Sequence, residues 1–301
     1  MATPNKLDLC GVWVPIVTPF SSEGALDTTG LRQLADHILA EGATGLVALG
    51  TTGEPATLSG AERVEVVGIC SSASDQAGAP LIVGAGTNST AGTIHEINRL
   101  SAAGNAAAAL VVVPYYTRPS EQAVVEHFHV VADASPIPIV IYNIPYRTGR
   151  GLGVEALLEA GSHPNVIGLK QSVGSLDHDT LELLRRRSDG FHIMAGDDAF
   201  ITPTVLMGGS GAIAAAAHFC TPLFVSMVDA AANGNVRRAE SIAARLLPVV
   251  DAGFAEPSPA VWKAALHHRQ EIMSNFVRRP MTEASPGSVT VLIEAAANAV
   301  G

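Results

Sequence analysis

The sequence predicts an α/β fold, a closed (β/α)₈ barrel followed by a C-terminal helical extension. Eight short apolar runs alternate with segments of helical periodicity, and most runs are continuously apolar, as in strands covered by helices on both faces. After the eighth run, residues 218–301 carry helical patterns only. Barrels of this kind commonly occupy roughly 250 residues or more as one unit, so the chain length of 301 residues fits.

The strands and helices can be placed in order along the chain. The predicted strands are Val12–Val17, Gly45–Leu49, Pro80–Gly84, Ala107–Val113, Ile137–Asn143, Val166–Lys170, His192–Ala195 and Ala212–Ala216. Between them, Leu31, Leu34 and Ile38 show helical spacing after a start signal at Asp27. A later helix ends at Arg185-Arg186-Arg187, where cations suit the helix C-terminus.

The C-terminal part is expected to form a small helical extension. We expect residues 1–232 to form the barrel and residues 233–301 the extension, with helix breaks at Pro248, Pro257 and Pro259. No linker or repeat separates the two parts. The alternative architecture is an open doubly wound sheet, which the alternating pattern alone also fits.

Composition and charge exclude several classes of protein. The chain is 48% hydrophobic and 15% charged, which favours a large core over disorder, and its net charge of −10 disfavours binding to nucleic acids or membrane surfaces. Three widely spaced cysteines argue against a disulfide framework. No signal peptide or apolar run of membrane-spanning length is present, so we expect a soluble, cytoplasmic protein.

Two candidate catalytic residues stand at strand ends, where barrel active sites lie. Lys170, one of three lysines, ends a buried run. Burial disfavours its charged form and frees the amine as a nucleophile for carbonyls, although a lysine reaching into solvent fits the position equally. Tyr142 ends the preceding run and could move protons. The alternative is an aromatic residue that fills the barrel.

Two candidate binding features lie nearby. Gly50-Thr51-Thr52-Gly53-Glu54 follows the second strand, and its backbone N–H groups could point at a carboxylate. An ordinary strand-to-helix turn is the alternative. Arg147, just past Tyr142, is suited to clamp a carboxylate, unless it is an exposed loop arginine. Asp197-Asp198 is weak evidence for a cation site.

Ordered motifs over nearly the whole chain carry a family resemblance. They are Val17-Thr18-Pro19-Phe20, Gly50-Thr51-Thr52-Gly53-Glu54, Pro114-Tyr115-Tyr116, Tyr142-Asn143-Ile144-Pro145, Gly168-Leu169-Lys170, Gly196-Asp197-Asp198, Gly208-Gly209-Ser210-Gly211-Ala212-Ile213, Glu256-Pro257-Ser258-Pro259 and Arg279-Pro280-Met281-Thr282. Together they resemble the dihydrodipicolinate synthase and N-acetylneuraminate lyase family of pyruvate-dependent aldolases, which are TIM barrels. The resemblance favours the barrel over the open sheet.

The resemblance implies a lyase that uses a Schiff base. Lys170 would form the imine with pyruvate, and Tyr142 would move the protons. Thr51 would link Tyr142 to Tyr116, which comes from a neighbouring subunit, so a homo-oligomer is implied, a homotetramer built as a dimer of dimers. The backbone at Thr51 and Thr52 would bind the pyruvate carboxylate. Ile213 would line the same pocket, and no metal or organic cofactor would be needed.

The resemblance implies that the second substrate is an aldehyde. Within the family, Arg147 favours the synthases, because the matching arginine would bind aspartate semialdehyde on the route to lysine and diaminopimelate. Two departures, Gln171-Ser172-Val173 and Ser258-Pro259, leave room for a catabolic aldolase or dehydratase of a 2-keto-3-deoxy sugar acid or related 2-oxo acid. A third hypothesis is a barrel that only binds an oxo acid, which would not need Lys170, Tyr142 and Thr51 together.

The resemblance also predicts insensitivity to lysine. Feedback-inhibited relatives bind this cation with acidic and imidazole side chains. The matching positions here are Gly92, Gly60 and Arg63, with Pro55 in place of a small hydroxyl residue. A fixed cation and a missing counter-charge both disfavour lysine binding.

Overall fold

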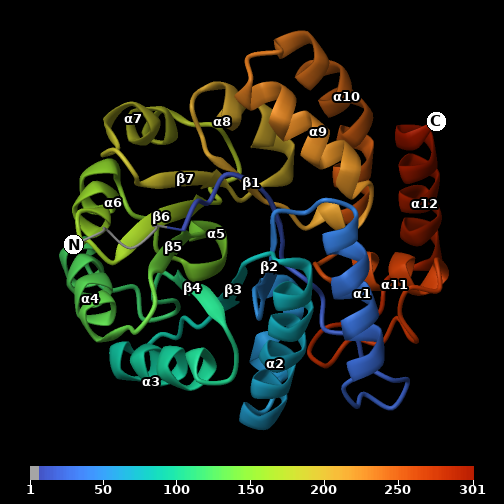
Figure 1. Ribbon diagram of the computed structural model, residues 1–301, viewed down its shortest axis with the longest axis horizontal. Coiled ribbons are helices and arrows are strands. Elements are labelled where there is room, and N and C mark those ends of the chain that lie inside the picture. The colour runs from blue at the N-terminus through green and yellow to red at the C-terminus, as the bar shows by residue number, and fades with distance from the viewer. Residues whose placement is uncertain (1–6) are drawn as a thin grey trace.

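The computed structural model describes residues 7–301, in which parallel strands close into a barrel in sequential order (Figure 1). The strands are β1 (Gly11–Val14), β2 (Gly45–Ala48), β3 (Leu81–Gly84), β4 (Ala106–Val112), β5 (Ile139–Asn143), β6 (Val166–Gln171), β7 (His192–Ala195) and β8 (Gly211–Ile213). The predicted barrel is confirmed, and the open sheet is excluded because β1 pairs with β8. Lys6 and the N-terminus considered for a signal lie outside the described residues.

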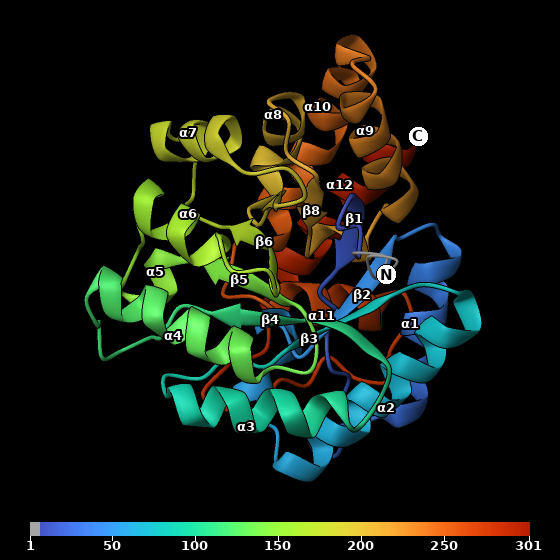
Figure 2. The same ribbon diagram turned by 60° about the vertical axis from the view of Figure 1, so that its left-hand side comes forward.

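Helices ring the strands, and further helices gather on one side (Figures 1 and 2). The helices of the ring are α1 (Thr28–Ala40), α2 (Gly60–Ala77), α3 (Thr90–Ser101), α4 (Glu121–Ala134), α6 (Val154–Gly161), α7 (His178–Arg186), α8 (Ile201–Leu206) and α9 (Thr221–Ala232), and the short α5 (Pro145–Thr148) lies inside the ring after β5. They are followed by α10 (Val236–Gly253), α11 (Ala260–His268) and α12 (Pro286–Val300), with α12 packed on α10 and α11. Within residues 7–301, no helix is long and apolar enough to cross a membrane.

Local signals explain where the helices begin and end. Asp27 caps α1, because its Oδ1 accepts a hydrogen bond from the backbone N–H of Gly30 at 2.9 Å. Asp177 caps α7 in the same way through Thr180, and Arg185 and Arg186 lie in the last turn of that helix. The first helix was predicted from Asp27 and the second from its C-terminal arginines.

Two glycines allow the barrel to close. Gly11 and Gly211 are partners in the β1–β8 pair. A Cβ on Gly211 would lie 2.0 Å from the carbonyl oxygen of Gly11, so no side chain fits there. Inside the closed barrel, Trp13, Val140 and Met194 belong to a buried core that is separate from the core between strands and helices.

An irregularity in β6 sets the direction of its side chains. Ile139 pairs with Val166, but Val140 pairs with Gly168, so Ile167 is an extra residue. From there the alternation of strand side chains turns Leu169 toward the helices and Lys170 into the barrel.

Three predicted ends or breaks of elements are wrong. β1 ends at Val14 and not at Val17. β8 ends at Ile213, and Ala216 starts a short 3₁₀ turn, because its N–H donates to Asp198 Oδ1 at 2.7 Å and not to a neighbouring strand. Pro248 was expected to break a helix but lies inside α10. Proline has no N–H group, so the carbonyl of Ala244 lacks its helical hydrogen bond. Both residues are exposed, so water can bind that carbonyl.

Candidate active site

A cavity of about 310 Å³ opens at the C-terminal ends of the strands. The predicted site residues that line it are Thr51, Thr52, Tyr142, Arg147, Lys170 and Ile213. Tyr142, Lys170 and Ile213 lie near the ends of β5, β6 and β8, whereas Thr51 and Thr52 follow β2 and Arg147 follows β5. The fold therefore brings six of the seven predicted site residues to one cavity, as expected for the functional end of a barrel.

Lys170 and Tyr142 form the centre of this arrangement. They are partners across the β5–β6 pair, and each is 6% exposed. The Nζ atom of Lys170 lies 4.3 Å from the centroid of the Tyr142 ring. This burial fits a lysine aimed into the cavity rather than one that extends into solvent, and it places a phenol beside the amine.

Gly196 leaves the space that the Lys170 side chain occupies. A Cβ at this position would lie 2.9 Å from Lys170 Cε and 1.9 Å from Ser172 Oγ. Any larger residue would therefore displace the lysine or the serine. The glycine that follows β7 is thus part of what fixes the position of Lys170.

The Thr51-Thr52 turn forms one wall of the cavity. Residues Thr51–Gly53 form a single 3₁₀ turn, in which Thr52 is buried and Thr51 faces the opening. Thr18 Oγ1 donates to the carbonyl oxygen of Gly53 at 2.7 Å and fixes the end of the turn. A turn of this kind exposes backbone N–H groups that can bind an anion.

A second wall combines Arg147, Tyr146 and Asp197. The Arg147 guanidinium carbon lies 5.8 Å from the centroid of the Tyr146 ring, whose hydroxyl donates to Asp197 Oδ1 at 3.2 Å. The other oxygen of Asp197 accepts the N–H of Gly174 at 2.7 Å. Within residues 7–301 no carboxylate forms an ion pair with Arg147, so its charge is available to a ligand.

Asp198 is a buried acid in the same cavity. Its Oδ1 accepts the N–H of Ala216 at 2.7 Å. Burial raises the pKa of Asp198 to about 7, although the Ala216 N–H and the charge of Lys170 oppose this shift; Asp197 adds to it. This carboxyl group therefore changes its charge near neutral pH.

Tyr116 is the predicted residue that the fold does not bring to the cavity. Its side chain is 86% exposed, and its backbone has the left-handed φ of 72°. The N–H of Tyr116 donates to the carbonyl oxygen of Thr148 at 3.2 Å, which directs the side chain outward. Within one chain, Tyr116 does not line the site.

Several further residues line the cavity. Asp197 and Asp198 follow β7 and were considered from the sequence only as weak evidence for a cation site, not as predicted site residues. Val250 and Phe254 come from the end of α10 and the residue after it, and no local signal points to them, whereas Ser258 was noted only as a departure from the family pattern. They show that the C-terminal helices complete the cavity.

The two departures from the family pattern differ in position. Ser258 lines the cavity. Gln171 instead accepts a hydrogen bond from Asn143 at 2.9 Å and donates to Thr180 at 3.2 Å, away from the cavity. Neither Ser172 nor Val173 lines the cavity, so only the Ser258 departure can contact a substrate directly.

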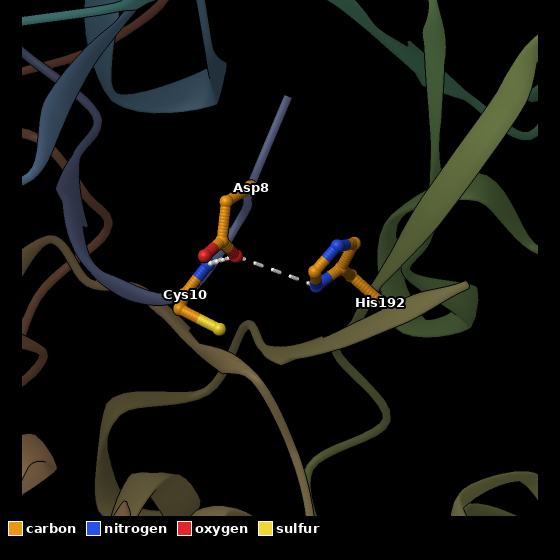
Figure 3. A group of neighbouring side chains, drawn as sticks. All are labelled: Asp8, Cys10 and His192. Carbon is orange, nitrogen blue, oxygen red and sulfur yellow. Dashed lines mark hydrogen bonds and ion pairs between the residues drawn. The ribbon is translucent and has the colours of Figure 1, made fainter. Parts of the chain in front are cut away.

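One group of possible metal ligands lies at the opposite end of the barrel (Figure 3). Asp8 and Cys10 stand at the start of β1 and His192 at the start of β7, with ligand atoms within 4.8 Å of one another. Asp8 Oδ1 already accepts the Cys10 N–H at 2.9 Å, and burial together with Asp8 raises the pKa of the Cys10 thiol to about 11. This group is separate from the cavity.

Comparisons with known proteins show the family to which the chain is similar. The sequence model of the dihydrodipicolinate synthetase family matches residues 8–296. A 4-hydroxy-tetrahydrodipicolinate synthase from Neisseria meningitidis serogroup C is 35% identical over 290 residues, 95% of this chain and 98% of that protein. One from Methanothrix thermoacetophila is 38% identical over 255 residues, 85% of each chain. The crystal structure of DHDPS from Cyanidioschyzon merolae with lysine bound superposes with a TM-score of 0.93 at 32% identity, covering 98% of this chain and 99% of that one.

Proposed function

The chain belongs to the dihydrodipicolinate synthetase family of class I aldolases and lyases, and we propose that it is a 4-hydroxy-tetrahydrodipicolinate synthase. In this proposal it condenses pyruvate with aspartate semialdehyde in lysine and diaminopimelate biosynthesis, in the cytoplasm. The observation that carries the proposal is the buried Lys170–Tyr142 pair in a cavity that also presents Arg147. Relatives at 35–38% identity bear the synthase name.

Lys170 would supply the nucleophile. Its neutral amine attacks the keto carbon of pyruvate, and water leaves as the protonated imine forms. The imine withdraws electrons, so the methyl carbon of pyruvate loses a proton and becomes an enamine carbon. This carbon then attacks the aldehyde carbon of the second substrate, which becomes a hydroxyl-bearing carbon. The amino group of that substrate attacks the imine carbon, closes the ring and displaces the Lys170 amine, which leaves with a proton.

Tyr142 would move the protons that these steps require. Its ring lies against Lys170 Nζ, so the phenol is close to the atoms that gain and lose protons. Thr51 would connect Tyr142 with Tyr116 of a neighbouring subunit. The 86% exposure of Tyr116 supports this assembly, because an exposed tyrosine on a rigid turn can enter a second copy of the chain. A dimer, within a dimer of dimers, would then be the smallest active species.

The two carboxylates of the substrates would bind on opposite walls. The Thr51-Thr52 turn and Ile213 would bind pyruvate, and Arg147 would bind the carboxylate of aspartate semialdehyde.

We also propose that the chain divides into a barrel, residues 1–232, and a helical extension, residues 233–301. Val250, Phe254 and Ser258 of the extension would face the second substrate.

The second candidate function is a catabolic aldolase or dehydratase of a 2-keto-3-deoxy sugar acid or related 2-oxo acid. The observation that favours it is Ser258, which lines the cavity at a position where the synthases carry asparagine. A shorter hydroxyl side chain leaves room for a different substrate and changes the hydrogen bonds available to it.

An activity screen tests the proposal. Purified enzyme is supplied with pyruvate and, in parallel, with aspartate semialdehyde or several sugar-acid aldehydes, and the consumption of each pair is measured. We expect kcat/KM to be highest with aspartate semialdehyde. A higher kcat/KM with a sugar-acid aldehyde would contradict the synthase assignment and favour the catabolic one.

A further inference from the structure

A buried ion pair joins the C-terminal helices to the turn that follows β2. Lys263, on α11, is 0% exposed, and Glu54 is 6% exposed. Lys263 Nζ lies 2.8 Å from Glu54 Oε1, although 209 residues separate them in the sequence. The carboxylate of Glu54 is therefore held from the far end of the chain.

Arg278 binds the second oxygen of the same carboxylate. Its backbone N–H donates to Glu54 Oε2 at 2.9 Å, and its guanidinium donates to the carbonyl oxygen of Thr57 at 2.9 Å. The Phe20 ring packs against both cations, 4.1 Å from Lys263 Nζ and 4.4 Å from the Arg278 guanidinium carbon. Both carboxylate oxygens of Glu54 are thus bound by residues of the C-terminal part.

Glu54 lies directly behind the wall of the active site. It joins the 3₁₀ turns Thr51–Gly53 and Pro55–Thr57 and has the left-handed φ of 52°, which is unfavourable for a residue with a side chain. Its N–H donates to the carbonyl oxygen of Thr51 at 3.2 Å. Any shift of Glu54 is therefore passed to Thr51 and Thr52.

We propose that Glu54 and Lys263 are positioning residues, through which the C-terminal helices fix the Thr51-Thr52 turn in the conformation that binds the pyruvate carboxylate. This inference rests on the proposed function, in which that turn binds pyruvate. A buried ion pair contributes little net stability compared with an apolar pair of similar size, but it specifies geometry when every partner is satisfied. The position of the pair behind the turn suits this use.

The test replaces the carboxylate while keeping its shape. Glu54→Gln removes the charge, and the rate at which borohydride traps pyruvate on the protein is measured against pyruvate concentration. We expect the half-saturating concentration to rise about 10- to 100-fold, since a misplacement near 1 Å has effects of this size. As a control, Leu292→Ala opens a cavity in the fully buried part of α12 and does not touch Glu54. It should lower Tm and leave half-saturation unchanged.

A double variant separates positioning from stability. Glu54→Gln with Lys263→Met leaves no buried charge unpaired, so the fold should survive even if Glu54→Gln alone unfolds. A wild-type Tm with a raised half-saturating concentration supports the inference. Wild-type half-saturation in the double variant overturns it. If the wild-type protein itself traps no pyruvate, the proposed function fails, and the inference fails with it. If the wild-type protein traps pyruvate but the double variant has wild-type half-saturation, only the inference fails.

Discussion

The two buried lysines of the described chain, Lys170 and Lys263, have similar surroundings but different partners. Each ammonium lies close to an aromatic ring, 4.3 Å from Tyr142 in one case and 4.1 Å from Phe20 in the other. Lys263 pairs with Glu54 at 2.8 Å, whereas within residues 7–301 Lys170 has no ion pair and faces the cavity. Burial and an aromatic neighbour are therefore common to both lysines, and only Lys170 lines the open cavity. We expect this open approach, without a bound carboxylate, to make Lys170 the reactive lysine.

The pKa of Lys263 illustrates the same point. Burial lowers the pKa of Lys263 to about 8, although Glu54 opposes the shift. A lowered pKa alone would suggest a nucleophile at Lys263. Its amine is nevertheless enclosed by Glu54 and Phe20 and does not line the active-site cavity, so we do not expect it to reach a substrate.

The largest expected difference between the two lysines comes from replacing each with methionine. Lys170→Met should lower turnover at least about 10⁴-fold, because the nucleophile is lost, and should leave the fold intact. Lys263→Met should lower the free energy of unfolding by about 3–5 kcal/mol, because Glu54 stays buried without its partner. Turnover assays and urea unfolding measure the two effects. Turnover of Lys170→Met within tenfold of wild type would contradict the assignment of different roles to the two lysines.

Tyr142→Phe sharpens the comparison, because it makes the ring beside Lys170 chemically like the ring beside Lys263. Loss of the hydroxyl should lower kcat by roughly 10²–10⁴-fold through loss of proton transfer. The free energy of unfolding should change by less than about 1 kcal/mol, since the ring still packs in the barrel. Near-normal turnover would mean that Tyr142 only fills space.

Asp198 gives the cavity of Lys170 a pH dependence of its own. Its pKa is about 7 in the fold, above the ordinary value of 3.8, so between these values the native state keeps a proton that the unfolded chain loses. The free energy of unfolding should therefore fall as pH rises through this window, by up to about 4 kcal/mol from this group. Asp198→Asn should abolish that contribution and be more stabilising at pH 8 than at pH 4, measured by urea unfolding at each pH. An equal effect at both would contradict the assignment.

The smallest expected effect is that of free lysine on the enzyme. Arg63 donates to Glu96 Oε1 at 2.9 Å and to the carbonyl oxygen of Pro55 at 2.8 Å. The segment in which regulated relatives would bind the lysine cation thus already contains the guanidinium of Arg63, held by two partners. Initial rates should be unchanged by millimolar lysine. Strong inhibition would show that lysine binds elsewhere, at a site of different construction.

The sequence was informative wherever a local pattern reflects a local cause. Continuous apolar runs located all the strands, and the strand-end rule found Lys170 and Tyr142, because parallel strands bring their C-terminal ends together. β7 has the predicted bounds, His192–Ala195. The end of β8 was predicted too late in the sequence, because the N–H of Ala216 donates to Asp198 and not to a neighbouring strand.

Long-range contacts account for what the sequence did not predict. Glu54 and Lys263 are 209 residues apart, and helical periodicity says nothing about which buried charge meets which. Val250 and Phe254 reach the cavity only because α10 folds back over the barrel mouth. The prediction at Pro248 was wrong for a simpler reason: on an exposed helix face, water can bind the carbonyl of Ala244 that lacks its N–H partner.

Trapping of the imine tests the central claim most directly. The protein is incubated with pyruvate and borohydride, digested, and the modified peptide is identified by mass spectrometry. The account predicts one pyruvate-derived group per chain, on Lys170, and none on Lys263, whose amine is enclosed by Glu54 and Phe20. Label on Lys263 or Lys6, or no label in an enzyme that turns over, would contradict it.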